Sequence, residues 1–421
     1  MYLKDIDSFL CDNSNYLIDI QSGDLFELDD KDNFLSIYSS GKYYKDSEKE
    51  IANFISLNKD RKKNFNTNNE IIDINIIRIN VSNACNLACK YCYAHGGNYS
   101  NVDSLMSMEV AKDIVKFIKE YMNKADTIFF FGGEPLLNVD VIEYICSEFE
   151  DKSFKLITNG TILNDRVIAV LKKYNISIGL SLDGPAEFHD KFRVTKEGKP
   201  TFKTILNNIK KLKDNKINIL NLQGTYTDFT NKYISKEELI NYFNDNFNFK
   251  FLTISNDVNS IDNIYDENES YVIDSIKKEK NVLLGLLFNA LMNSKAKYNN
   301  VDFKCGAGNK SILIYSDGTI YPCQRFISEK MFNLSNIYNF NSNEFLSMRN
   351  KFNSEYLKIE KCNNCVAKFI CNICLAERKN ISEKNCHRIQ ERANLIYNNL
   401  PNYLLDKSLM NHYENILEYI K

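Results

Sequence analysis

The sequence predicts an α/β fold, with a mostly parallel sheet that follows a small N-terminal unit and precedes a cysteine-rich C-terminal unit. Three observations predict it. Apolar strand patterns alternate with helical patterns over residues 76–293, which is typical of a parallel sheet covered by helices. Residues 1–61 have a hairpin pattern of their own, and seven of the 12 cysteines fall between residues 305 and 386. A barrel-like sheet and a doubly wound sheet both fit this pattern.

The central part contains six predicted strands and six predicted helices in alternation. The strands cover 76–82, 127–133, 154–160, 176–183, 217–227 and 249–255. The helices cover 108–123, 139–150, 164–174, 202–215, 236–245 and 271–293.

The ends of the chain are predicted from turns and helical spacing. Two alternating runs around Ser22-Gly23-Asp24 predict a hairpin, and helices are predicted at 33–40 and 46–57. A hairpin with short helices indicates a winged-helix shape for residues 1–61. The predicted domains then follow along the chain as a linker at 62–75, the sheet domain at 76–293, the cysteine-rich domain at 300–390 and a helical tail at 391–421.

Composition and charge exclude several classes of protein. The net charge of −2 gives no bulk attraction to nucleic acid or to an anionic membrane. The start MYLKDIDSFL lacks the apolar run of a signal peptide, and the apolar run at 282–292 is too short to span a bilayer. We therefore expect a cytoplasmic protein with no nucleic-acid or membrane partner. In such a chain, clustered cysteines indicate metal centres rather than disulfides, whereas the isolated Cys11 and Cys146 are predicted to be buried core residues.

Four unusual loops follow four successive predicted strands. They are CNLACKYC (85–92), GGEP (132–135), TNGT (158–161) and SLDGP (181–185). The carboxyl ends of parallel strands are where α/β folds assemble their ligand sites. The sequence therefore predicts one ligand site built from these loops.

The first loop holds Cys85, Cys89 and Cys92 in a C-x3-C-x2-C spacing. Three thiolates can hold three irons of a four-iron cube, which leaves the fourth iron without a protein ligand. An open metal position is typical of a catalytic site, whereas structural sites are closed. The alternative is a structural zinc site with His95 as its fourth ligand, but it leaves GGEP and SLDGP unexplained.

Together these motifs resemble the radical S-adenosylmethionine (SAM) enzymes. The resemblance covers 76–255 and rests on the three cysteines, the aromatic Tyr91 before the last of them, and GGEP after the second strand. It implies a partial (β/α)6 barrel and a [4Fe–4S] cluster whose open iron is chelated by the methionine part of SAM. It further implies that the reduced cluster cleaves SAM to a 5′-deoxyadenosyl radical, which takes hydrogen from a substrate. Cys85, Cys89 and Cys92 are then catalytic residues as well as metal ligands.

The other strand ends offer groups that suit this cofactor. Gly132 and Gly133 lack a Cβ, so backbone can approach a ligand closely there. Glu134 can accept hydrogen bonds from the methionine ammonium group, and Arg193 can pair with the methionine carboxylate. The alternative for Arg193 is a surface ion pair.

Four more residues are expected at the cofactor from the resemblance. Ser181 and Asp183 match polar residues that family members direct at SAM. Tyr91 is expected near the adenine, and Asn159 is expected to reach the same cavity. For Asn159 and Asp183 the alternative is a turn-capping role.

The C-terminal cysteines resemble the SPASM extension of radical SAM enzymes, which binds auxiliary four-iron clusters. The resemblance assigns the ligands of one cluster as Cys362, Cys365, Cys371 and Cys386, and those of the other as Cys305, Cys323 and Cys374. Family members usually place three residues before the last cysteine of the central run, whereas this chain has only Asn372 and Ile373. Seven cysteines for two cubes leave one iron of the second set open, unless His387, water or another ligand fills it.

The N-terminal stretch YLIDIQSGDLFELDD, with the later KDSEKEIANFI, resembles the precursor-recognition element of ribosomal peptide biosynthesis. This implies that a leader peptide adds as a strand to the edge of its sheet. The alternative is a small domain that only packs on the rest of the chain.

The whole chain therefore resembles ribosomal-peptide maturases of the thioether-forming sactipeptide and ranthipeptide type. We expect a cysteine-rich precursor peptide with a leader as substrate and an external electron donor such as flavodoxin or ferredoxin. One alternative is a sulfatase maturase that makes formylglycine, which the missing cysteine between 305 and 323 disfavours. Carbon–carbon crosslinking of a peptide is a second alternative. A non-catalytic iron-sulfur electron carrier is a third, and it leaves GGEP and SLDGP without a role.

Overall fold

The computed structural model describes most of the 421-residue chain. The described residues are 1–4, 8–12, 14–20, 25–40, 56, 74–99, 102–247, 251–257, 306–327, 330–356, 359–369, 371, 373–378 and 381–404. The chain divides into two compact units. The smaller unit takes residues 1–69, 265–304 and 354–421, and the larger takes 70–264 and 305–353.

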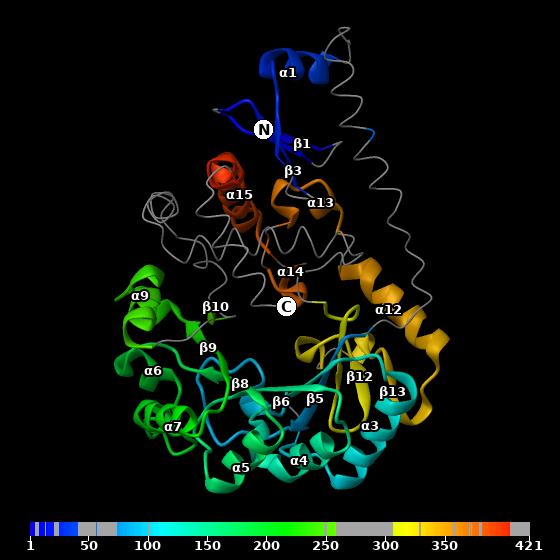
Figure 1. The fold of residues 1–421 in the computed structure, drawn as a ribbon, viewed down its shortest axis with the longest axis vertical. Coiled ribbons are helices and arrows are strands. Elements are labelled where there is room, and N and C mark those ends of the chain that lie inside the picture. The colour runs from blue at the N-terminus through cyan, green and yellow to red at the C-terminus, as the bar shows by residue number, and fades with distance from the viewer. Residues whose placement is uncertain are drawn as a thin grey trace. The chain divides into compact units, whose positions relative to one another are not determined.

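The larger unit is built on a nine-stranded sheet with the order β10-β9-β8-β7-β6-β5-β11-β12-β13 (Figure 1). Six of its strands are parallel to their neighbours and match the six predicted strands: β5 (Ile76–Ser82), β6 (Thr127–Gly132), β7 (Ser153–Thr158), β8 (Ser177–Ser181), β9 (Ile219–Tyr226) and β10 (Phe251–Asn256). The predicted mixed α/β fold with a parallel sheet is confirmed, while its closure into a partial barrel stays a prediction.

Helices connect these strands and lie beside the sheet (Figure 1). Those that match predicted helices are α3 (Met108–Tyr121), α4 (Val139–Ser147), α5 (Asp165–Lys173), α7 (Phe202–Asp214) and α9 (Lys236–Asn246). Side chains cap several of them, as where the Ser107 hydroxyl accepts a hydrogen bond from Val110 N at the start of α3. The helix predicted at 271–293 lies outside the described residues. Within the described ranges, no helix combines the length and the apolar character needed to cross a membrane.

Two short helices of the larger unit were not predicted, α6 (Ala186–Phe192) and α8 (Asp228–Asn231). Each is too short to show a helical repeat of apolar residues. Pro185 is the N-cap residue of α6, and the fixed φ of proline suits the start of a helix. Of the two, α6 matters for function because it carries part of the candidate site.

The sheet continues into the cysteine-rich region of the chain. Strand β11 (Ser311–Ile314) is parallel to β5, with Ile312 opposite Ile77, and every residue of β11 is buried. Strands β12 (Thr319–Tyr321) and β13 (Ser335–Asn336) then extend the sheet in antiparallel fashion. Residues 305–353, predicted as part of a separate cysteine-rich domain, thus belong to the same compact unit as the parallel strands.

The smaller unit begins with a four-stranded antiparallel sheet in the order β1-β2-β3-β4. Its elements are β1 (Tyr2–Leu3), β2 (Ser8–Leu10), β3 (Tyr16–Asp19), β4 (Leu25–Glu27) and the helix α1 (Lys31–Ser40). The predicted hairpin is confirmed by the pairing of β3 with β4. Its turn at 21–24 and, apart from residue 56, the helix predicted at 46–57 lie outside the described residues, so the winged-helix shape stays a prediction.

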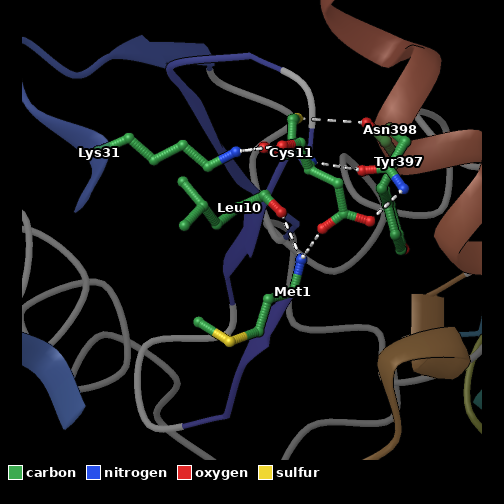
Figure 2. Close-up of polar contacts among 7 residues, drawn as sticks. Met1, Leu10, Cys11, Lys31, Tyr397 and Asn398 are labelled. Atoms are coloured by element: carbon green, nitrogen blue, oxygen red, sulfur yellow. Dashed lines mark hydrogen bonds and ion pairs between the residues drawn. The ribbon is translucent and has the colours of Figure 1, made fainter. Parts of the chain in front are cut away.

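The C-terminal segment of the smaller unit packs directly on this sheet. It contains α13 (Glu360–Asn363), the 3₁₀ turn η6 (Val366–Phe369), α14 (Leu375–Arg378) and α15 (Glu383–Leu404). Phe9, Ile18 and Cys11 share a buried core with Ala393 and Tyr397 of α15. Cys11 lies beside Tyr397 and donates to its carbonyl oxygen at 3.5 Å (Figure 2).

The two isolated cysteines lie where the sequence predicts them. Cys11 is buried in the core of the smaller unit, and Cys146 is buried on α4 of the larger one. The remaining described elements are the helix α12 (Ser342–Tyr356) and the 3₁₀ turns η1 (His95–Gly97), η2 (Pro135–Asn138), η3 (Gln324–Phe326), η4 (Lys330–Phe332) and η5 (Ile337–Asn339).

Candidate functional site

The cysteine loop is seated on the end of β6 by contacts between backbones. Gly133 N donates to Ser82 O at 2.8 Å, and Glu134 N donates to Ala84 O at 2.9 Å. A Cβ on Gly97, whose φ is +101°, would lie 2.3 Å from the Cα of Gly133. A Cβ on Gly133 would likewise lie 2.4 Å from Ala84 O, so the absence of a side chain at both glycines lets the cysteine loop approach the end of β6. The sequence analysis did not foresee this neighbour.

The loop turns N–H donors toward its cysteine sulfurs. Cys85 Sγ accepts from Leu87 N at 3.4 Å and faces Asn159 Nδ2 at 3.7 Å. Cys92 Sγ accepts from Gly96 N at 3.4 Å. Such donors stabilise the negative charge of a metal-bound thiolate. Without a metal, burial raises the pKa of the Cys85 thiol to about 12, helped by the nearby Glu134 charge. A bound metal would have to displace that proton.

Glu134 lies fully buried at the end of β6 and joins it to the end of β7. Its carboxylate accepts hydrogen bonds from Thr158 Oγ1 at 2.8 Å, Asn159 N at 2.8 Å and Leu136 N at 3.1 Å. Burial raises its pKa to about 7, although these three donors oppose the shift. Most of the accepting capacity of this carboxylate is thus used within the protein, and its contact with a methionine ammonium group remains a prediction.

Asp183 and Arg193 form a buried ion pair, with Arg193 Nη2 3.2 Å from Asp183 Oδ1. Their side chains are 4% and 10% exposed, so the alternative of a surface ion pair for Arg193 is wrong. Asp183 Oδ1 also accepts from Thr225 N at 3.0 Å, and Tyr91 donates its hydroxyl hydrogen to Asp183 Oδ2. Burial opposes the ionisation of Asp183, but the Arg193 charge, the nearby His189 and the hydrogen bonds from Arg193 and Tyr91 together outweigh it, so the pKa of Asp183 is lowered.

The same pair borders the cysteines. The charges of Arg193 and Asp183 both act on the pKa of the Cys89 thiol, which burial raises. The guanidinium of Arg193 also lies over the ring of Tyr91, 5.6 Å from its centroid. The loops after β5, β6, β7 and β8 therefore meet, and the site residues they bring together are Cys85, Cys89, Cys92, Tyr91, Gly132, Gly133, Glu134, Asn159, Asp183 and Arg193.

A series of hydrogen bonds through His189 and Thr201 connects the backbone of Asp183 to the backbone of Arg193. The sequence analysis missed it. Asp183 N donates to His189 Nδ1 at 3.2 Å, and His189 Nε2 lies 3.0 Å from Thr201 Oγ1. Thr201 donates its hydroxyl hydrogen to Arg193 O at 2.7 Å, so His189 Nε2 must carry the proton that it shares with Thr201. Burial lowers the pKa of His189 to about 4 and keeps the ring neutral. The only signal for it was a histidine in α6, the helix that was not predicted.

Two predicted residues have mixed or weak contacts. Asn159 Oδ1 accepts from Thr161 N at 2.9 Å, so its turn-capping alternative is correct, while its Nδ2 group faces Cys85 and Asn86. Ser181 ends β8 and is half-buried. His95, the fourth ligand of the zinc alternative, is exposed in η1.

Tyr93 links the cysteine loop to the β11–β12 hairpin. Burial raises its pKa to about 12, and the charges of both Cys323 and Cys92 contribute. The guanidinium of Arg325 lies 4.6 Å from the centroid of its ring. Cys323 therefore lies near the first cysteine loop, although the two are far apart in sequence. The signal was the high density of tyrosine on both segments, which the sequence analysis did not use.

In the smaller unit, four C-terminal cysteines are neighbours. Burial raises the pKa of Cys386, and the charges of Cys362, Cys371 and Cys365 raise it further, while Lys361 lowers it. Gln390 Nε2 of α15 donates to Cys365 Sγ at 3.4 Å. These four are the set predicted to hold one auxiliary cluster.

The other predicted auxiliary ligands are less fully described. Cys305 lies outside the described residues, and Cys323 and Cys374 belong to different compact units. His387, one alternative ligand, is 71% exposed and its Nδ1 lies 3.1 Å from the Glu391 carboxylate. Within the described ranges, no three ligating side chains converge tightly enough to hold a single metal ion, whereas each thiolate of an iron-sulfur cube binds a different iron.

Comparisons with known proteins agree with the site. Residues 79–245 match the radical SAM superfamily, and residues 305–366 match the SPASM iron-sulfur cluster-binding domain. A cysteine-type anaerobic sulfatase-maturating enzyme of Clostridium perfringens is 27% identical over 68% of this chain and 84% of its own length. The radical SAM cyclopropyl synthase TigE of Paramaledivibacter caminithermalis is 26% identical over 53% of this chain and 49% of its own.

Solved structures share the fold at low identity. Native anSMEcpe with bound AdoMet has a TM-score of 0.62 and 22% identity over 81% of this chain and 99% of its own. Streptococcus suis SuiB bound to precursor peptide SuiA has a TM-score of 0.53 and 16% identity over 88% of this chain and 95% of its own.

Sequence motifs, strand-end geometry and family matches thus agree on the cofactors, which are SAM, a [4Fe–4S] cluster at the strand ends and auxiliary iron-sulfur clusters in the SPASM domain. With a radical SAM domain at residues 79–245 and a SPASM domain at 305–366, the chain is a radical SAM enzyme of the SPASM-domain type.

Proposed function

We propose that this enzyme matures a ribosomally made, cysteine-rich precursor peptide by forming thioether crosslinks. The observation that carries the proposal is the four-stranded N-terminal sheet, which packs on the same segment that holds four clustered cysteines. A small antiparallel sheet suits the capture of an extended leader peptide by strand addition, and among the described residues its outer strand β4 pairs only with β3. The fold likeness to SuiB, which was solved with its precursor peptide, supports the same reading.

The chemistry requires a hydrogen atom to be removed from a carbon of the peptide. When bound, SAM and its cluster supply a 5′-deoxyadenosyl radical for this step. The C–H bond and the S–H bond of a cysteine break, and a C–S bond forms. One hydrogen atom would pass to the 5′-deoxyadenosyl radical and give 5′-deoxyadenosine, the thiol proton would be released, and the remaining electron would be accepted by an auxiliary cluster. An external donor such as flavodoxin or ferredoxin would supply the electron that starts each cycle.

The chain's own residues would bind and orient the groups involved. Cys85, Cys89 and Cys92 would hold the cluster, and the buried Asp183–Arg193 pair beside Cys89 would orient the amino-acid end of SAM. Glu134 would share that end of the cofactor. Tyr91, Asn159 and Ser181 would complete the cavity, with Gly132 and Gly133 keeping the loop close.

The auxiliary cysteines would serve two further clusters. Cys362, Cys365, Cys371 and Cys386 would close one of them, and Cys305, Cys323 and Cys374 would bind the other with one iron open to a substrate thiolate. Such an iron would deprotonate the thiol and fix it near the reacting carbon.

The sheet edge most suited to the leader is β4. Strand β1 has only two residues, and the terminal amino group of Met1 next to it is held by Leu10 O and Asp12 (Figure 2). Leu28 N donates inward to Asn15 O at 2.7 Å. Because neighbouring residues of a strand alternate, the N–H of Glu27 points away from β3 and toward the edge.

A sulfatase maturase is the second candidate, because the sulfatase-maturating enzyme of Clostridium perfringens aligns with two thirds of this chain. The products separate the candidates by mass. A thioether keeps the cysteine sulfur and loses one pair of hydrogens, whereas conversion of cysteine to formylglycine loses the sulfur. Carbon–carbon crosslinking also loses hydrogen but leaves thiols that an alkylating reagent can label.

The Glu27→Pro variant tests leader capture, because proline removes the outward N–H without touching the bonds between β3 and β4. We expect processing of a leader-bearing peptide to fall at least about tenfold, measured by mass spectrometry under anaerobic conditions. Cleavage of SAM without peptide should stay unchanged. Glu27→Ala is the matched control, since it keeps the N–H. Equal processing by the proline and alanine variants would contradict leader capture at β4.

A further inference from the structure

Helix α15 directs a polar side chain at one of the auxiliary cysteines. Gln390 Nε2 donates to Cys365 Sγ at 3.4 Å, and both groups are partly buried. Gln390 belongs to neither the predicted ligand set nor the predicted SAM site. A hydrogen bond from a side-chain amide to sulfur strengthens when the sulfur carries more negative charge.

A second donor on the same helix lies nearby. Tyr397 is 3% exposed, and its hydroxyl has no hydrogen-bond partner among the described residues. Burial raises the pKa of Tyr397, and the charge of Cys365 adds to the shift. A buried hydroxyl without a partner is costly, and the sulfur atoms of a cluster at Cys365 would supply an acceptor.

The N-terminal sheet holds this part of α15 in place. The rings of Phe9 and Tyr397 pack with centroids 5.2 Å apart, and Cys11 Sγ donates to Tyr397 O. Asn398 exchanges hydrogen bonds of 3.0 Å with Asp12 (Figure 2). Tyr397 is therefore part of a packed core rather than a mobile surface group.

We propose that Gln390 and Tyr397 set the reduction potential of the auxiliary cluster at Cys362, Cys365, Cys371 and Cys386, through hydrogen bonds directed at Cys365 and its surroundings. The inference rests on the proposed auxiliary cluster but goes beyond its ligands. Reduction adds one negative charge to the cluster, and hydrogen-bond donors stabilise that charge. Removing a donor makes reduction harder and shifts the potential to a more negative value.

The test uses the full chain with Cys85, Cys89 and Cys92 replaced by alanine, so that only auxiliary clusters contribute to the spectra. Reduction potentials are measured by electron paramagnetic resonance during a redox titration. Gln390→Leu removes the amide donor at similar volume, and Tyr397→Phe removes the hydroxyl alone. Asn398→Leu is the matched control on the same helix, because Asn398 bonds to Asp12 instead.

We expect one auxiliary signal to shift to a more negative potential in Gln390→Leu and in Tyr397→Phe, and further in the double variant. Asn398→Leu should leave it in place, and all variants should bind the same amount of iron. Unmoved potentials in fully loaded Gln390→Leu and Tyr397→Phe variants would overturn the inference. Absence of auxiliary iron from the parent chain would instead overturn the proposed cluster, so the two failures are distinguishable.

Discussion

The cysteine loop of the larger unit and the four-cysteine group of the smaller unit are built in different ways. Around Cys85, Cys89 and Cys92 the chain is held by backbone bonds to β6 and by a buried ion pair. Around Cys365 and Cys386 it is held by the long helix α15 with shorter helical turns, and by an apolar core shared with the N-terminal sheet.

The difference separates two uses of the same ligand. The first loop has three cysteines beside a charged pair, which suits an iron left open for a charged cofactor. The second group has Cys386 near three other cysteines, beside an amide, a phenol and apolar side chains, which suits a closed cluster that carries electrons. The groups around the cysteines thus favour a reactive cluster in one case and an electron-carrying cluster in the other.

The sharpest test of this contrast replaces Cys85, Cys89 and Cys92 together with alanine. We expect the loss of about four irons per chain and the fall of 5′-deoxyadenosine formation to background, because the groups proposed to bind SAM, Glu134 and the Asp183–Arg193 pair, lie beside this loop. Iron analysis and chromatography of the SAM products measure both. Auxiliary iron should remain, and persistent SAM cleavage would break the assignment of the first loop.

The seating of the first loop on GGEP is tested by Gly97→Ala. Its new Cβ would meet the Gly133 Cα at 2.3 Å, and backbone cannot move away cheaply. We expect SAM cleavage to fall at least about tenfold and iron to be lost selectively from the first site.

Gly96→Ala is the matched control for that variant. Gly96 also has a positive φ, of +79°, but a Cβ there meets nothing within 4 Å. Both variants therefore share the backbone strain, and only one has the clash. Equal losses in the two would show that strain alone, and not contact with GGEP, supports the loop.

The buried hydrogen bonds of His189 beside Asp183 and Arg193 predict that the stability of the larger unit depends on pH. The pKa of His189 is lowered from 6.5 to about 4, so the unfolded state binds a proton more readily than the folded state. The contribution of His189 to the free energy of unfolding is therefore fully present above pH 6.5. It is lost as the pH drops toward 4, which lowers the free energy of unfolding by up to about 3 kcal/mol. Denaturant unfolding of metal-free protein at several pH values measures it.

The variant His189→Gln keeps an amide near Nε2 but cannot gain a proton. Its free energy of unfolding should be lower than that of the parent near pH 7, and the gap should narrow at acid pH. A gap that stays constant from pH 7 to pH 4 would mean that the pKa of His189 is not lowered by folding, and would contradict the buried hydrogen-bonded position of its ring.

The strands and the ligand loops were the most predictable part of the molecule. β5 was predicted with the bounds that it has, because IIRINVS is a short apolar run before a loop of polar residues and cysteines. The grouping of the loops followed from a general property of parallel sheets, whose carboxyl ends share one edge. The surface alternative for Arg193 stayed open in the sequence and is wrong in the structure, because sequence alone gives no measure of burial.

The rest depended on contacts between distant segments. Nothing local in Ser311–Ile314 indicates that β11 pairs with β5, since an apolar strand fits any open sheet edge. His189 and Thr201 act through hydrogen bonds around a helix too short to leave a periodic pattern. The link between Gln390 and Cys365 likewise depends on how α15 is rotated about its axis.

The pairing of β11 with β5 also has a consequence for synthesis of the chain. One edge of β5 pairs with β6, and the other must wait for β11 while the ribosome adds residues 83–310. At about 5–20 residues per second this takes on the order of ten seconds or more. Throughout that time the nascent chain presents an open, apolar strand edge, the kind of template on which unwanted pairing begins. A chain that stops before residue 311 never covers that edge, so the catalytic sheet cannot be separated cleanly from the cluster-binding segment that completes it.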